Sequence, residues 1–184
     1  MWKAIAKFYF KLFRWEVTGN TPSHKKFIII VMPHTSGYDF VLSKCYGVCF
    51  GIKSRFLVKK EACFFPLNLI IKAFGGIPVD RWNNRHLAEQ LVEYFNSKAE
   101  FGLTLTPEGT RKKVRRLKKG FYYIAQSTGA SVYMGFIDCN TRRLGIGPEF
   151  IITGDYDKDL VQIREFYKGM EGLHRGRFDA SILT

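Results

Sequence analysis

Short apolar runs rich in β-branched residues alternate along this chain with longer stretches in which apolar positions recur every three or four residues. The first pattern is typical of buried strands and the second of amphipathic helices. Strands are predicted over residues 27–32, 55–59, 76–79, 101–106, 131–138 and 144–147, and helices over residues 2–15, 38–50, 65–73, 84–98, 117–128 and 157–170. This alternation predicts an α/β fold, a largely parallel sheet flanked by helices on both faces. The link Thr141-Arg142-Arg143 predicts a hairpin between the last two strands, so the sheet is expected to be mixed.

The first candidate catalytic residues follow the end of the strand predicted over residues 27–32. The run from Met32 to Asp39 (MPHTSGYD) places His34 and Asp39 at the carboxyl edge of the predicted sheet, where ligand crevices form in open α/β sheets. Histidine is suited to accept a proton near neutral pH, and a neighbouring carboxylate can fix its tautomer. Residues five positions apart lie about 140° apart on a helix, so the two would meet only if His34 sits in a turn before the helix. The alternative is a helix-capping aspartate beside an incidental loop histidine, and this motif alone leaves both interpretations open.

Two later segments add acidic, hydroxyl and guanidinium side chains at similar places. GGIPVDR runs from Gly75 to Arg81, and PEGTR runs from Pro107 to Arg111. With H-x4-D at His34, these motifs, in this order and spacing, resemble the glycerolipid acyltransferase superfamily, whose best-known type is the lysophosphatidic acid acyltransferase. The matched motifs occupy the central part of the chain, from about residue 28 to residue 132. The chain departs from the family where Pro33 replaces a common asparagine and Lys112 a common serine, which bears on the acceptor but not on the dyad.

The resemblance implies an acyltransferase that moves a fatty acyl group from acyl-CoA or acyl carrier protein to the hydroxyl of a lysophospholipid-type acceptor, such as lysophosphatidic acid. In that scheme His34 is the general base and Asp39 orients it, without a covalent acyl-enzyme, a metal or a cofactor. The residues implied to shape the acceptor site are Gly76, Glu108, Gly109 and Thr110. Arg81 and Arg111 are candidates for a phosphate clamp, because guanidinium groups grip phosphate bidentately.

Two alternatives concern individual residues of these motifs. Ser36 lies two positions from His34 and is a conceivable nucleophile, although a bond within the turn or a helix cap accounts for it equally well. Glu108 is either part of the acceptor site or a structural partner of one of the arginines. Between the first two motifs, Lys59, Lys60 and Glu61 fall where the family often has a basic and acidic pair.

Composition indicates an anionic partner. The 184 residues suit a single domain over residues 1–184, and 29 basic against 16 acidic residues give a net charge of +13. The stretch from Arg111 to Lys119 carries lysine or arginine at all but two positions, which suits lipid phosphates, coenzyme A, an acidic carrier protein or simply solvent. A basic nucleic-acid-binding module is the rival hypothesis, but it leaves the three motifs unexplained, and no nucleic-acid partner is expected. An inactive lipid-binding relative is disfavoured by the intact His34 and Asp39.

The first fifteen residues predict an amphipathic helix with a narrow basic arc and a broad apolar arc. Lys3, Lys7, Lys11 and Arg14 form the basic arc. The segment is shorter than the roughly twenty residues that span a bilayer, and its lysines interrupt any signal-peptide core. Residues 1–15 are therefore expected to lie in an anionic membrane surface, the alternative being a helix docked on its own domain. Because the four cysteines show no paired C-x-x-C spacing, we expect no metal site. Because no signal peptide is recognised, we expect a reduced compartment, with the protein peripheral on the cytoplasmic face of the membrane.

Overall fold

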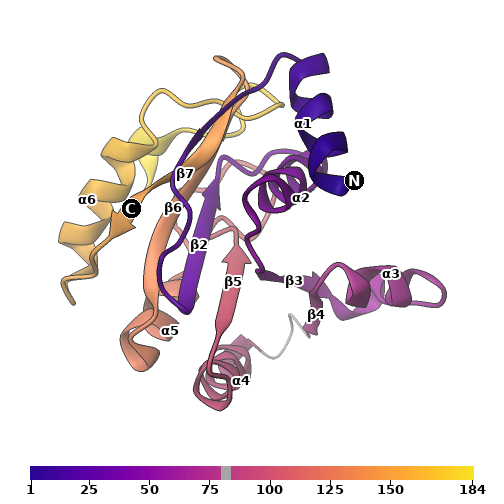
Figure 1. The fold of residues 1–184 in the computed structure, drawn as a ribbon. Helices are drawn as coiled ribbons and strands as arrows, with labels where there is room; N and C mark the ends of the chain where they lie inside the picture. The colour runs from indigo at the N-terminus through magenta and orange to yellow at the C-terminus, as the bar shows by residue number, and fades with distance from the viewer. Residues whose placement is uncertain (80–83) are drawn as a thin grey trace.

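The computed structural model describes residues 1–79 and 84–184, in which seven strands form one sheet (Figure 1). The strands are β1 (Glu16–Gly19), β2 (Lys26–Met32), β3 (Arg55–Lys59), β4 (Gly76–Val79), β5 (Phe101–Leu105), β6 (Ser131–Asp138) and β7 (Arg143–Phe150). The α-helices are α1 (Trp2–Leu12), α2 (Tyr38–Phe50), α3 (Leu67–Ala73), α4 (Asn84–Ser97), α5 (Gly120–Thr128) and α6 (Tyr156–Phe166). Short 3-10 helices follow β3 (Lys60–Ala62) and precede the last residues (Ala180–Ile182).

The strands lie in the order β1-β7-β6-β2-β5-β3-β4. Every neighbouring pair is parallel except β6 and β7, which pair antiparallel through the hairpin that the sequence predicted. The mixed, largely parallel α/β sheet is therefore confirmed. Since β2 lies between β5 and β6, the ends of these three strands meet at one edge of the sheet.

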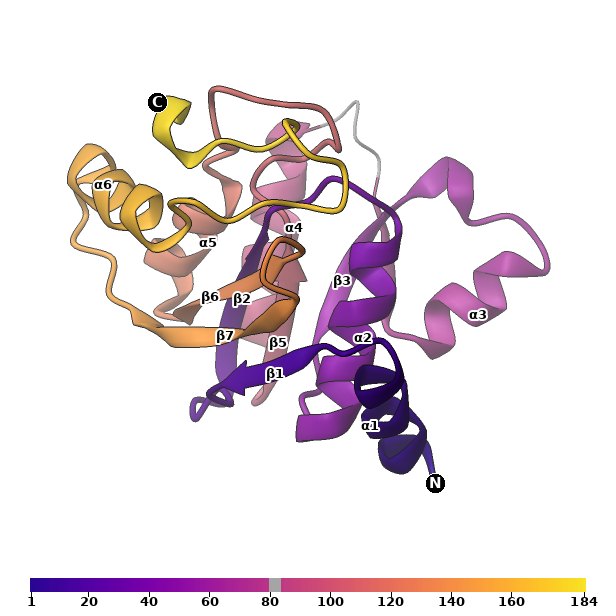
Figure 2. The same cartoon turned by 90° about the horizontal axis from the view of Figure 1, so that it is seen from above.

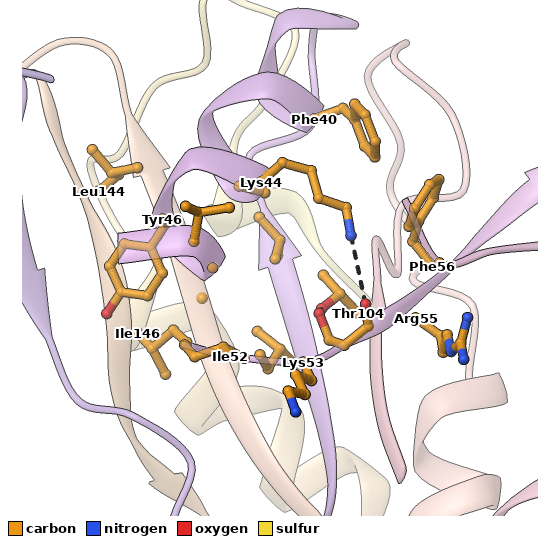
Figure 3. A pocket seen from close by; sticks show the side chains of 18 of the residues that line it. Phe40, Lys44, Tyr46, Ile52, Lys53, Arg55, Phe56, Thr104, Leu144 and Ile146 are labelled. Atoms are coloured by element: carbon orange, nitrogen blue, oxygen red, sulfur yellow. Dashed lines mark hydrogen bonds between the residues drawn. The ribbon is translucent and has the colours of Figure 1, made fainter. Parts of the chain in front are cut away.

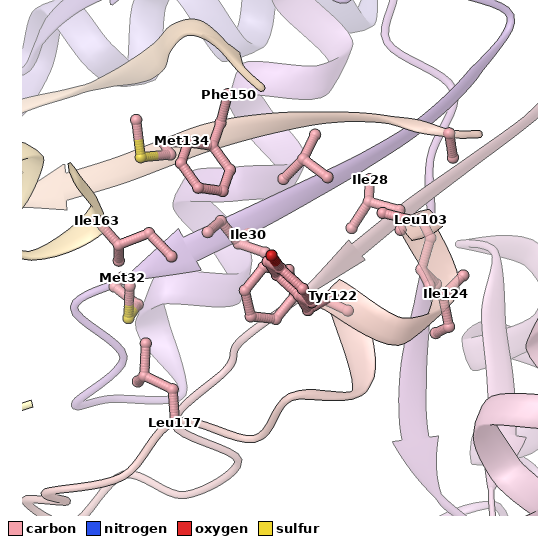
Figure 4. Close-up of a cluster of buried hydrophobic side chains, with 14 of the residues drawn as sticks. Ile28, Ile30, Met32, Leu103, Leu117, Tyr122, Ile124, Met134, Phe150 and Ile163 are labelled. Carbon is pink, nitrogen blue, oxygen red and sulfur yellow. The ribbon is translucent and has the colours of Figure 1, made fainter. Parts of the chain in front are cut away.

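The central strand β2 explains the two-layer packing, because its apolar side chains alternate between two separate cores. Ile28, Ile30 and Met32 face a core built with α4, α5 and α6, part of which Figure 4 shows. Phe27, Ile29 and Val31 face a second core built with α1 and α2. Helices therefore cover both faces of the sheet, as predicted.

The site is positioned mainly by α2, which starts just after β2. This helix ends at Gly51, whose left-handed conformation at φ 70° is the usual signal for a helix C-terminus. On the other face, α6 starts at Asp155, whose side chain accepts a hydrogen bond from the Lys158 amide. Inside the first turn of α6, the buried Asp159 carboxylate accepts hydrogen bonds from Tyr122 and Thr153, which tie α6 to α5.

The structure corrects several predicted boundaries. β1 was not predicted, and it pairs parallel with β7 at the edge of the sheet. The helix predicted over 2–15 stops at Leu12, because the chain turns through a left-handed residue at Arg14 to enter β1. The helix predicted over 117–128 begins only at Gly120, and the helix predicted over 157–170 spans Tyr156–Phe166. The strand predicted over 144–147 extends over Arg143–Phe150.

Helix α1 docks on its own domain, which was the alternative for this segment, but it leaves much of its apolar arc exposed. It buries Ala6 and Phe10 in the core beneath α2, and its Tyr9 hydroxyl hydrogen-bonds with the Tyr38 hydroxyl of α2. Its other apolar side chains stay exposed, namely Trp2, Ile5, Phe8 and Leu12. Across the described part of the chain, no helix is long and apolar enough to cross a bilayer.

Candidate active site

The sequence-predicted dyad forms in the turn between β2 and α2. His34 lies just after β2, and Asp39 lies in the first turn of α2. The His34 Nδ1 and Asp39 Oδ2 atoms are 3.1 Å apart. The chain brings them together because His34 precedes the helix, which is the condition that the spacing imposed.

The Asp39 carboxylate is held firmly and is nearly inaccessible, with 3% of the residue exposed. Its Oδ2 atom also accepts hydrogen bonds from the backbone amides of Thr35 and Ser36, each at 2.9 Å. The capping alternative is not what the structure shows, because α2 has no side-chain cap hydrogen bond and Asp39 accepts from two amides of the turn before the helix. With Nδ1–H donating to Asp39, the lone pair of the ring lies on Nε2, which makes Nε2 the basic atom.

Glu108 lies beside the dyad. Its Oε2 atom accepts a 2.7 Å hydrogen bond from the backbone amide of His34, so it braces the turn, and no ion pair with Arg111 is found among the described residues. The residue is 3% exposed. Burial raises the pKa of Glu108 from 4.5 to about 8, with a smaller contribution from the negative Asp39, while the His34 amide acts in the opposite direction. Glu108 is therefore mainly protonated at neutral pH.

The rest of the PEGTR motif reaches the same place from the end of β5. Arg111 packs against the N-terminus of α2, where a Cβ built on Gly37 would lie 3.5 Å from its guanidinium. Gly109 has a left-handed backbone at φ 63°, and its missing side chain leaves room for Lys118. The Thr110 hydroxyl accepts a hydrogen bond from the Lys112 amide within the loop. Arg111 and the positive end of α2 thus offer two adjacent attractions for an anion.

The middle motif, GGIPVDR, begins in the turn before β4 and continues through that strand. Gly76 lies in β4, where an added Cβ would come within 2.4 Å of the Ile71 side chain, so its smallness serves the packing of α3. Gly76 does not line the cavity that adjoins the dyad, whereas Val79 of the same strand does. Arg81 lies outside the described residues. Lys59, of the weaker basic and acidic match, lines the cavity and pairs with Glu61 at 3.7 Å.

Ser36 has a local structural role. Its hydroxyl accepts a hydrogen bond from the Tyr38 amide at 3.1 Å, which shapes the entry into α2. The arrangement matches the turn-forming alternative for this residue, and the dyad's hydrogen bond is made with Asp39.

A large cavity adjoins the dyad and is here called the catalytic cavity. It has a volume of about 1030 Å³, and His34, Asp39, Arg111 and Lys118 line it together with Gly109. Much of its wall is apolar and comes from β3, α3, α4 and α5, including Leu57, Ile70, Leu91, Phe121 and Ile124. A site that joins a basic imidazole and an arginine to a long apolar wall suits an anionic amphiphile.

The chain after α6 supplies further residues of the site, which no sequence pattern indicated. The Thr35 hydroxyl accepts a hydrogen bond from the His174 amide at 3.1 Å, and Gly172 lies so close that a Cβ there would be 2.3 Å from that hydroxyl. Further along, the Thr184 amide donates to the Arg115 carbonyl. Figure 2 shows this yellow segment passing close to the loop that precedes α5. Residues 170–184, here called the C-terminal strap, thus hold the catalytic turn from outside.

At the carboxyl edge of the sheet, a half-buried His34 thus pairs with the buried Asp39 beside a largely apolar cavity. The family model described as Acyltransferase matches residues 14–135, so the chain belongs to the acyltransferase family. A comparison with curated proteins gave no significant match.

The fold is also similar to a solved structure, the 1-acyl-sn-glycerophosphate (LPA) acyltransferase PlsC from Thermotoga maritima. That comparison has a TM-score of 0.58 and 18% sequence identity, and it covers 88% of this chain and 74% of the PlsC chain. At this identity the likeness concerns the fold.

Proposed function

We propose that this protein transfers a fatty acyl group from an acyl thioester, acyl-CoA or acyl carrier protein, to the hydroxyl of a lysophospholipid-type acceptor such as lysophosphatidic acid. The observation that carries the proposal is the His34–Asp39 pair at 3.1 Å, opening into the catalytic cavity. The family match and the PlsC-like fold support the same chemistry.

The reaction needs one general base and no cofactor. His34 Nε2 removes the proton from the acceptor hydroxyl as its oxygen attacks the thioester carbonyl carbon. Asp39 stabilises the imidazolium that forms. The tetrahedral intermediate then collapses, the carbon–sulfur bond breaks, and the imidazolium returns its proton to the thiolate. The products are an ester and a free thiol, and His34 is neutral again. A positioned base of this kind contributes about 10²–10⁴-fold to the rate.

The acceptor's phosphate is assigned to Arg111. Its guanidinium lies beside Gly37 at the start of α2, so the phosphate would meet both a bidentate donor and the helix dipole. Lys118 lines the same cavity and adds positive charge. The apolar wall of the cavity is assigned to the donor's acyl chain.

Membrane contact is assigned to exposed apolar side chains on both sides of α2. In Figures 1 and 2, α2 lies between α1 and α3. Phe8 of α1 is 66% exposed, and Phe65, just before α3, is 78% exposed. Aromatic side chains of this kind, next to lysines, suit the headgroup region of an anionic bilayer on the cytoplasmic face. This position would bring the catalytic cavity near its lipid substrates.

The decisive experiment incubates the purified protein with labelled acyl-CoA or acyl carrier protein and a panel of lysolipids. We expect an ester product with a lysolipid acceptor, and we expect His34→Ala to abolish it while the circular dichroism spectrum stays unchanged. Retained turnover in His34→Ala would remove this residue from the mechanism.

The same panel tests the phosphate assignment. Arg111→Ala is expected to raise KM for a phosphorylated acceptor about tenfold or more, since a charge-assisted bidentate contact is lost. An equal loss with a phosphate-free acceptor would show that Arg111 does not recognise phosphate.

A further inference from the structure

A second cavity lies between α2 and the sheet, apart from the dyad. It has a volume of about 580 Å³ and is here called the α2 cavity. His34, Asp39 and Arg111 line only the catalytic cavity, and Lys44, Lys53 and Arg55 line only the α2 cavity. The two cavities share a wall made of Val31, Phe40, Ser43, Phe56, Phe74 and Thr104.

Charge and apolar surface are segregated within the α2 cavity. Figure 3 shows Lys44 and Arg55 toward one end, near Phe56, and Leu144 and Ile146 toward the other. The apolar end is made by strands β2, β6 and β7, which contribute Ile29, Ile137, Leu144 and Ile146. No aspartate or glutamate is among the residues that line it, so the described wall has a positive charge with no internal counterion.

Of the three cations that line the α2 cavity, only Lys44 is partly buried. Its ammonium donates a 2.9 Å hydrogen bond to the Phe74 carbonyl and lies 4.5 Å from the centre of the Phe56 ring. Burial, together with the nearby Arg55, lowers the pKa of Lys44 to about 8. Among the described residues, no carboxylate forms an ion pair with it. A partly dehydrated cation of this kind is stabilised by an anionic ligand.

We propose that the α2 cavity is a second lipid site, which binds a free long-chain fatty acid with its carboxylate at Lys44 and its hydrocarbon tail along the sheet. A single anionic group fits, because Lys44 has three donors and two of them already face the carbonyls of Phe74 and Ser54. Lys53 and Arg55 are exposed and remain solvated, so they attract the anion at the entrance. The hydrocarbon tail of the fatty acid would lie against the apolar end of the α2 cavity, and the volume of this cavity lies in the range of small-molecule sites.

The α2 cavity is distinct from the apolar wall that was assigned to the donor's acyl chain. The fatty acid proposal therefore does not depend on the proposed acyl transfer. A fatty acid here lies outside the residues that contact the dyad. It would occupy the face of the shared wall opposite the donor's acyl chain, with Phe40 and Phe56 between the two lipids.

The test measures binding of a fluorescent fatty acid, cis-parinaric acid, to the full chain. Lys44→Met, which keeps the length but removes the charge, is expected to weaken binding about tenfold or more. Lys44→Arg is expected to retain most of the affinity, and Lys98→Met, an exposed lysine after α4, is the matched control. The methyl ester of the probe is expected to bind at least tenfold more weakly than the acid.

Three further variants show which of the two cavities binds the probe. Val48→Trp, at a partly exposed α2 position that lines the α2 cavity, is expected to abolish binding by filling it. Ala62→Trp, which lines the catalytic cavity, and His34→Ala are expected to leave binding unchanged. The proposal is overturned if the ester binds as tightly as the acid, if Lys44→Met and Val48→Trp bind like the wild type, or if Ala62→Trp is the variant that loses binding.

Discussion

The buried Glu108 carboxyl predicts a specific pH dependence of folding stability. Its pKa lies at about 8 in the folded protein and at 4.5 ordinarily. As the pH rises above 4.5, the unfolded chain releases this proton while the folded protein keeps it. The folded state then binds more protons, so stability falls with rising pH until the folded pKa is passed near pH 8.

The size of this effect follows from the two pKa values. Each pKa unit corresponds to about 1.36 kcal/mol, so this one group is expected to remove about 4 kcal/mol of unfolding free energy between pH 5 and pH 9. Glu108→Gln keeps an oxygen that can accept the His34 amide bond, but it cannot ionise. The variant should therefore gain about 4 kcal/mol relative to the wild type over that pH interval, whatever its starting stability at pH 5.

Urea unfolding followed by circular dichroism at pH 5, 7 and 9 measures this difference. All other titrating groups are shared by the two proteins, so their contributions cancel in the comparison. Parallel stability curves for the wild type and Glu108→Gln would refute the reasoning, because they would mean that Glu108 ionises normally in the folded state.

Three further outcomes follow from the geometry. Asp39→Asn is expected to lower kcat about 10²–10⁴-fold with little change in KM, because the neutral amide does not hold the imidazole tautomer; steady-state acyl transfer measures it. Gly172→Ala is expected to displace Thr35 and so to lower both Tm and kcat, whereas Gly120→Ala, where an added Cβ meets nothing within 4 Å, should not lower Tm; thermal unfolding and initial rates decide. Phe65→Asp is expected to weaken sedimentation with anionic liposomes, and Val161→Asp, at an exposed apolar site on α6, should not; equal effects would exclude a specific membrane face.

Local patterns predicted the central part of the fold and the dyad. The apolar run of β2 is buried on both faces, so its sequence alone identified a buried strand. His34 and Asp39 follow it directly, and their spacing required the turn that the structure contains. Arg111 was placed correctly beside them because it also follows the end of a strand, β5.

The features that escaped prediction depend on distant parts of the chain. β1 is four residues long and carries no long apolar run, and it is a strand because β7 pairs with it. Glu108 follows β5, yet its partner is the backbone amide of His34, which no side-chain pattern encodes. Gly172 and Thr35 lie far apart in the sequence, so neither residue carries a local signal of the contact.

The C-terminal strap also determines how the protein can be divided. The region that matches the family ends at residue 135, but the bond that fixes Thr35 comes from His174. A fragment cut at the family boundary would contain the dyad, yet it would lack β7, α6 and the backbone that closes over the turn. An expression fragment that is meant to keep the native surroundings of His34 therefore has to extend at least to His174.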